Sequence, residues 1–203
     1  MIKFTSAVLG LLVFASAAHA QMGGMGEQQA FVPDVDEESL ILLRPDKWYP
    51  YFSESEQKVD TYYFPTGQKP EKWKEALQSQ RYRTTLGVTD AAQVQQARTQ
   101  ANKANCMDHQ VTFVTGGTEN GYSKNEWTEV CTSNSDSTLV TLNKVILGNE
   151  QLYSVSKIWK YEPKASDMEE WRQYLSQVYV CDPTTGANPC RSPNGGRGRG
   201  GPR

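Results

Sequence analysis

Histidine carries much of the acid–base and nucleophilic catalysis in enzymes, and this chain of 203 residues has two histidines, His19 and His109. His19 lies in an N-terminal segment with the features of a removable signal, so a Ser-His-Asp or Cys-His mechanism would have to use His109. His109 follows the predicted end of a helix, where a loop histidine is ordinary, and the chain has no G-x-S-x-G motif. The sequence therefore predicts no catalytic residue.

Carboxylates are the next residues that could perform chemistry. Glu126 and Glu129 flank Trp127 and suggest an acid–base pair, but residues three apart on a strand point to opposite faces. The acidic stretch from Asp34 to Glu38 lacks the glycine and the distal glutamate of an EF-hand, and a solvated linker explains it. Zinc-ligand spacings and phosphate-binding glycine motifs between a strand and a helix are also absent. We expect neither a metal nor a cofactor.

The four cysteines are Cys106, Cys131, Cys181 and Cys190. An even number in an exported chain predicts disulfides, and four cysteines allow three pairings. Pairing of sequence neighbours, Cys106 with Cys131 and Cys181 with Cys190, is the simplest, because turn-forming residues fill the segment between the last two. Without a C-x-x-C motif, the expected role of both bonds is structural.

An aromatic strand is the strongest candidate for a binding surface. Its residues Tyr153, Lys157, Trp159 and Tyr161 alternate with a second set and so share one face. One face of this strand must pack against helices, and the aromatic face is the better candidate for the core. The alternative is that these four residues form a ligand groove or a partner surface.

Residues 1–20 predict export. Lys3 precedes a short apolar run, which ends at the small-residue triplet Ala18-His19-Ala20, the pattern of a secretory signal peptide cleaved before Gln21. The apolar run is shorter than the roughly 20 residues that span a bilayer, so we expect no transmembrane anchor. The predicted location is therefore periplasmic or secreted, which suits disulfides. A net charge of −2 argues against nucleic-acid binding.

The rest of the chain divides into a leader, one domain and a tail. Residues 21–39 predict a flexible acidic leader, and residues 40–190 hold all five tryptophans and all ten tyrosines, enough large aromatics for one core. Residues 191–203 form an Arg/Gly tail with nothing to bury, which we expect to be disordered. An anionic contact through its arginines is the alternative to a tail without a specific partner.

Hydrophobic periodicity predicts strands and helices in separate groups. The expected strands cover 40–43, 58–64, 110–115, 122–132, 139–147 and 151–161. The expected helices cover 71–81, 90–106 and 166–178, the second capped by Asp90 and the third opened by a Ser166-x-x-Glu169 capping box. This order indicates an α+β domain with an antiparallel sheet of about five to six strands packed against two to three helices.

A scattered pattern of cysteines, aromatics and glycines resembles small uncharacterised exported proteins of Gram-negative bacteria. It comprises Cys106, Gly121-Tyr122, Trp127, Cys131, Gly148, Tyr153, Trp159, Trp171 and Cys181-Asp182. The order of strands and helices over residues 40–182 also resembles PsbP/Mog1-like domains. The resemblance implies a fold, and because that superfamily has several roles, no activity follows.

Three functions from different classes fit these observations. The first is a non-enzymatic interaction or accessory module of the cell envelope, or an inhibitor, whose partner is another envelope or exported protein. The second is a small-ligand carrier that uses the aromatic sheet face, for which a concave apolar pocket would be the sign. The third is a carboxylate-dependent hydrolase, which requires two carboxylates facing each other across a cleft.

Overall fold

A computed structural model describes residues 37–85, 87–133, 137–183 and 190. The predicted signal peptide, nearly all of the acidic leader and the Arg/Gly tail lie outside the described residues. In the part of the chain that is described, no helix is long and apolar enough to cross a membrane.

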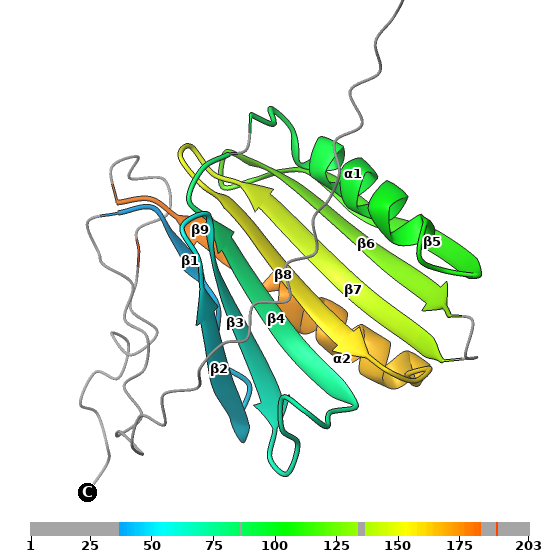
Figure 1. Ribbon diagram of the computed structural model, residues 1–203. Helices are drawn as coiled ribbons and strands as arrows, with labels where there is room; N and C mark the ends of the chain where they lie inside the picture. The colour runs from blue at the N-terminus through cyan, green and yellow to red at the C-terminus, as the bar shows by residue number, and fades with distance from the viewer. Residues whose placement is uncertain (1–36, 86, 134–136, 184–189, 191–203) are drawn as a thin grey trace, which may run out of the picture. The chain divides into compact units, whose positions relative to one another are not determined.

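The domain is built on a seven-stranded antiparallel sheet with the strand order β2-β3-β4-β8-β7-β6-β5 (Figure 1). These strands are β2 (Trp48–Glu54), β3 (Lys58–Pro65), β4 (Glu75–Tyr82), β5 (Asp108–Glu119), β6 (Tyr122–Thr132), β7 (Thr138–Leu147) and β8 (Leu152–Trp159). A separate two-stranded ribbon pairs β1 (Ser39–Ile41) with β9 (Tyr179–Cys181). The α+β class is confirmed, but the main sheet is larger than the five to six strands expected.

Strand β4 accounts for the main difference from the sequence prediction, which placed a helix over residues 71–81. Glutamate, alanine, leucine and glutamine favour helices in isolation, but here the segment lies between β3 and β8. Ala76 and Leu77 are both fully buried, one on each face of the sheet. Burial on both faces of a central strand outweighs an intrinsic helix preference of a few tenths of a kcal/mol per residue.

Within the described residues, two helices accompany the sheet, α1 (Ala91–Lys103) and α2 (Ala165–Ser176). Asp90 caps α1 as predicted, because its Oδ1 accepts from the Ala92 amide at 2.9 Å. The predicted capping box at the start of α2 is wrong: Lys164 is the N-cap and makes no side-chain cap bond, while Ser166 already lies inside the helix. Because the segment predicted as a helix over 71–81 forms strand β4 instead, the described residues contain two helices, the lower end of the two to three expected.

The helices lie on opposite sides of the sheet, which we call the α1 side and the α2 side. Side chains of successive strand residues alternate between the sides. On β7, Leu142 packs in a cluster with Leu175 of α2, whereas Val145 packs in a cluster with Ala91 and Val94 of α1. The ribbon adds to the α2 side, where Val180 packs with residues of β6, β7 and β8.

Lys144 joins the end of α2 to the sheet from a fully buried position on β7. Its Nζ donates to the carbonyl oxygens of Leu175 and Val178 at 3.1 and 2.7 Å. The same ammonium pairs with Glu119 at 2.8 Å and with Glu126 at 3.6 Å. A cation suits the carbonyl-rich C-terminal end of a helix, and here it also neutralises two carboxylates of the sheet.

Both disulfides of the near-neighbour pairing are formed, Cys106–Cys131 and Cys181–Cys190. The first connects the residue just beyond α1 to β6 across 25 residues of chain, and the second spans 9 residues after β9.

Replacing Cys106 and Cys131 together by alanine should lower the free energy of unfolding by about 3 kcal/mol, because the longer loop regains more entropy in the unfolded chain. Urea unfolding of the oxidised protein measures the change. The matched control is the double alanine variant of Cys181 and Cys190, for which we expect a smaller loss. An equal or larger loss in the control would contradict the entropic argument.

Candidate functional site

The aromatic strand that the sequence singled out lies mostly inside the protein. Tyr153, Lys157 and Trp159 of β8 point to the α2 side and are at most 1% exposed. Tyr161, just after β8, is 38% exposed. Three of the four residues therefore belong to the core, which is the first of the two interpretations of this face. Those three do not form an accessible partner surface.

Lys157 is held in an aromatic cage. Its Nζ lies 4.7, 4.7 and 4.6 Å from the ring centres of Trp48, Trp159 and Trp171, and 2.5 Å from Glu75 Oε2. Burial lowers the pKa of the ammonium to about 8, against the opposing effect of Glu75. The three rings come from β2, β8 and α2, so the cage fastens an edge strand and a helix to the centre of the sheet.

Glu126 and Glu129 point to opposite sides of the sheet, as the strand periodicity predicts. Glu126 lies on the α2 side, where Lys124 Nζ approaches it at 2.8 Å. Glu129 lies on the α1 side, where its Oε1 is 2.5 Å from His109 Nε2 and accepts from Asn102 Nδ2 at 3.1 Å. The two carboxylates do not face a common cleft. The His109–Glu129 contact was not foreseen, because it depends on the pairing of β5 with β6.

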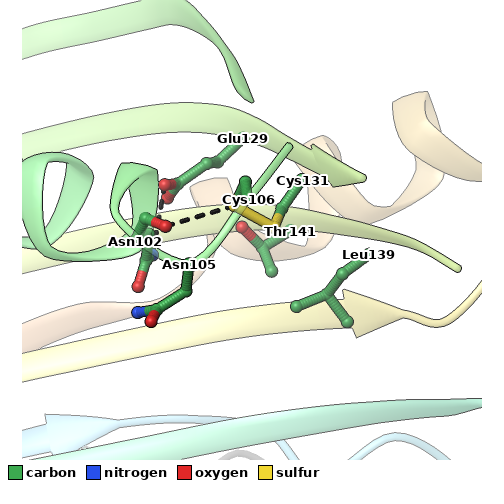
Figure 2. Close-up of a pocket in the computed structure, with 7 residues that line it drawn as sticks. All are labelled: Asn102, Asn105, Cys106, Glu129, Cys131, Leu139 and Thr141. Carbon is green, nitrogen blue, oxygen red and sulfur yellow. Dashed lines mark hydrogen bonds between the residues drawn. A yellow bond between two sulfur atoms is a disulfide. The ribbon is translucent and has the colours of Figure 1, made fainter. Parts of the chain in front are cut away.

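The Cys106–Cys131 disulfide borders a shallow cavity of about 170 Å³ at the C-terminal end of α1 (Figure 2). Asn102 and Glu129 form one wall of this cavity, and Leu139 and Thr141 of β7 form another. Cys106 Sγ also lies 3.2 Å from the Asn102 carbonyl oxygen. The disulfide thus fixes the last turn of α1 over β6 and sets the position of Asn102.

Helix α1 covers only part of its side of the sheet. It packs on β6, β7 and β5, whereas the front of β2, β3, β4 and β8 carries no helix (Figure 1). On β2 this leaves Tyr49 and Tyr51, each 51% exposed, side by side on the α1 side. Towards the β3–β4 connection, Trp73 packs against Phe64 and closes the core there. We call the helix-free part of the α1 side the open face.

A polar row runs from strand to strand across the α1 side of the sheet, from the open face to the strands beneath α1. Direct cross-strand pairing connects its members in the order Tyr51, Tyr62, Gln78, Ser156, Asn143 and Trp127. Gln78 Nε2 donates to the Tyr62 hydroxyl at 2.6 Å, and Ser156 Oγ donates to Asn143 Oδ1 at 2.7 Å. No member of the row is charged. Sequence analysis missed the row because its members come from six strands that only the strand register brings together.

The row ends in a second cavity, of about 240 Å³, beside α1. Gln78, Ser156 and Asn143 contribute to its floor, and Arg98 and Asn102 of α1 form its wall. Ser156 and Asn143 are only 6% and 5% exposed, so their polar groups line the cavity rather than the outer surface. The two cavities share Asn102, Glu129 and Thr141 and form one polar groove along α1.

The outer edge of β2 carries a proline at a position that matters for pairing. Thr66 donates to the Lys47 carbonyl and Ser55 to the Lys58 carbonyl, both at 2.9 Å. Hydrogen-bonded pairs alternate along an antiparallel ladder, so odd-numbered residues of β2 bond to β3 and even-numbered residues face outward. Pro50 therefore removes a donor from the open edge of the sheet.

No protein-family model matches the sequence, and no curated protein matches it. Among solved structures, the chain is similar to LpqN, involved in cell envelope biogenesis of Mycobacterium tuberculosis, with a TM-score of 0.46 and 14% identity over 73% of this chain and 86% of that chain. It is also similar to cyanobacterial PsbP from Synechocystis, with a TM-score of 0.45 and 13% identity over 78% of this chain and 100% of that chain. No residue role follows from either likeness.

Proposed function

We propose that the chain is an exported, non-enzymatic binding module of the cell envelope, and that its open face is the surface it uses. The observation that carries the proposal is the unequal covering of the two sides of the sheet. Over the centre of the sheet the α2 side is covered by α2 and the β1–β9 ribbon, which leaves Phe52 exposed at the edge strand. The open face instead presents two exposed tyrosines beside a polar groove. Exposed aromatics next to ordered polar groups are typical of binding surfaces.

The geometry gives less support to the two alternatives. A carrier requires a concave apolar pocket that encloses its ligand, but the groove beside α1 is lined by amides, hydroxyls and charged groups and opens to solvent. A hydrolase that works through Glu126 and Glu129 requires both at one cleft, and they point to opposite sides of the sheet. The module therefore acts by contact, as an accessory to an envelope assembly or as an inhibitor, and its partner resides in the compartment that receives it.

A photo-crosslinking amino acid at position 51 tests the proposal in cells that express and export the full chain. Position 170, on the exposed surface of α2, is the matched control site. We expect a discrete crosslinked product from position 51 and none from position 170. Crosslinks from position 170 alone, or equal crosslinking from both sites, would place the binding surface elsewhere. No product from either site would contradict a binding module.

A further inference from the structure

We infer that the polar row and the groove beside α1 bind a neutral sugar chain. The inference rests on the proposed function and narrows its partner from any envelope component to an uncharged glycan. The evidence is the kind of group that the row presents from Tyr51 to Asn143: two phenols, two amides and one hydroxyl, without a charge among them. The indole of Trp127 at the inner end is fully buried.

Amide and hydroxyl side chains suit sugar hydroxyls in particular. An amide accepts through its oxygen and donates through its nitrogen, and a hydroxyl does both, so a surface of such groups matches a ligand that is rich in hydroxyls. In the cavity, Ile158 and Trp127 add apolar surface beside Asn143. Tyr51 supplies a half-exposed ring at the other end of the row. Rings of this kind pack against the C–H faces of sugars while the amides bind their hydroxyls.

The charged groups that line the groove are engaged with the protein itself. Arg98 donates to Ser154 Oγ at 2.6 Å and also to Gln80. Gln80 in turn donates to Asp60 at 2.8 Å, which connects the cation to a carboxylate. On the acidic side, His109 and Asn102 both contact Glu129. Asp60 is itself paired with Lys58 at 2.8 Å, so the charges of the groove lining are one cation, Arg98, and one carboxylate, Glu129. The lining has no excess of either sign that would select a phosphate, a sulfate or an acidic polymer.

The length of the polar row favours a chain of sugar units over a single sugar ring as the ligand. Neighbouring strands lie about 4.8 Å apart, so the four steps from Tyr51 to Asn143 span roughly 19 Å. The cavity of about 240 Å³ at the inner end accommodates one unit of that chain. A peptide would be expected to extend the sheet at the β2 edge instead, and Pro50 removes a donor there.

The experiment is a calorimetric titration of the mature, oxidised protein with two probes, the β-1,4-linked tetramers of glucose and of N-acetylglucosamine. We expect at least one tetramer to bind, with an affinity that stays constant between 50 and 500 mM salt, because no charge pairing contributes. Gln78→Ala should weaken binding by about five- to tenfold, the effect of one lost hydrogen bond. Tyr51→Ala should weaken it as well.

Gln173→Ala is the matched control, since it removes the same side chain from the exposed surface of α2. It should leave binding unchanged, and near-ultraviolet circular dichroism should show that all variants keep the native fold. Failure of both tetramers to bind, or salt-sensitive binding of a polygalacturonate oligomer in their place, would overturn the inference.

The crosslinking experiment distinguishes failure of the inferred sugar binding from failure of the proposed binding function. A protease-sensitive product at position 51, combined with no sugar binding, would keep the binding module and replace the glycan by a protein partner. A product at position 51 that resists protease and is removed by glycosidase digestion would agree with the titration.

Discussion

The Lys144→Met variant is expected to lose about 3–5 kcal/mol of the free energy of unfolding, the largest effect of any single substitution considered for this protein. The substitution keeps most of the side-chain volume but leaves Glu119 and Glu126 without their buried cation. It also removes the donor to the carbonyl oxygens of Leu175 and Val178, which lie in the interior. Equilibrium unfolding in urea, followed by tryptophan fluorescence, measures the loss.

Lys124→Met is the matched control for this prediction. Lys124 pairs with the same two carboxylates, at 2.8 Å to Glu126 and 3.5 Å to Glu119, but its side chain is 16% exposed and, within the described part of the chain, it is not hydrogen-bonded to α2. A partly solvated ion pair contributes less than a buried one, so the control should lose clearly less stability than Lys144→Met. Similar losses in both variants would show that the bonds to α2 contribute little.

A second large effect concerns pH. Between about pH 8 and pH 10.5, the protein should gain up to about 3 kcal/mol of stability relative to a Lys157→Met variant. The Lys157 pKa is 10.5 in the unfolded chain and about 8 in the aromatic cage, so across this range the unfolded state holds a proton that the folded state has released. Raising the pH therefore favours the folded state, and below pH 8 this residue adds no pH dependence.

The measurement is a series of urea unfolding curves from pH 7 to pH 10.5 for both proteins. Tyrosines of the unfolded chain begin to ionise in the upper part of this range, whereas burial raises the pKa of Tyr122, Tyr153 and Tyr174 in the folded protein. This contribution is common to both proteins and cancels in the difference. Parallel stability profiles would contradict a lowered pKa of Lys157. Glu75→Gln provides an independent check: it removes the carboxylate that favours the charged lysine, so the gain should begin at a lower pH.

Local patterns in the sequence predicted those parts of the fold that depend on nearby residues. Strands β7 and β8 follow from the hydrophobic periodicity over 139–147 and 151–161, and α1 follows from Asp90 and the periodicity behind it. Strand β4 could not be predicted in this way, because Gln78 and its neighbours form a strand only between β3 and β8. The decisive contacts there are supplied by residues far away in the sequence.

The candidate site depends almost wholly on such distant contacts. Tyr62, Gln78 and Ser156 show no common motif, and they meet because three strands pair in one register. The contact between His109 and Glu129 has the same origin. Alternation along one strand correctly grouped Tyr153, Lys157 and Trp159 and favoured the core for their face, but it could not tell that the β1–β9 ribbon covers Tyr153 while α2 covers Trp159.

The β1–β9 ribbon has a consequence for the order in which the protein is made. Its strands, Ser39–Ile41 and Tyr179–Cys181, are the first and last strands of the described domain. A chain that crosses a membrane with its N-terminus leading delivers β1 long before β9, and contacts between such distant segments form slowly. Closure of the ribbon must therefore wait for the arrival of the last strand, and the Cys181–Cys190 bond then fixes the chain directly after β9.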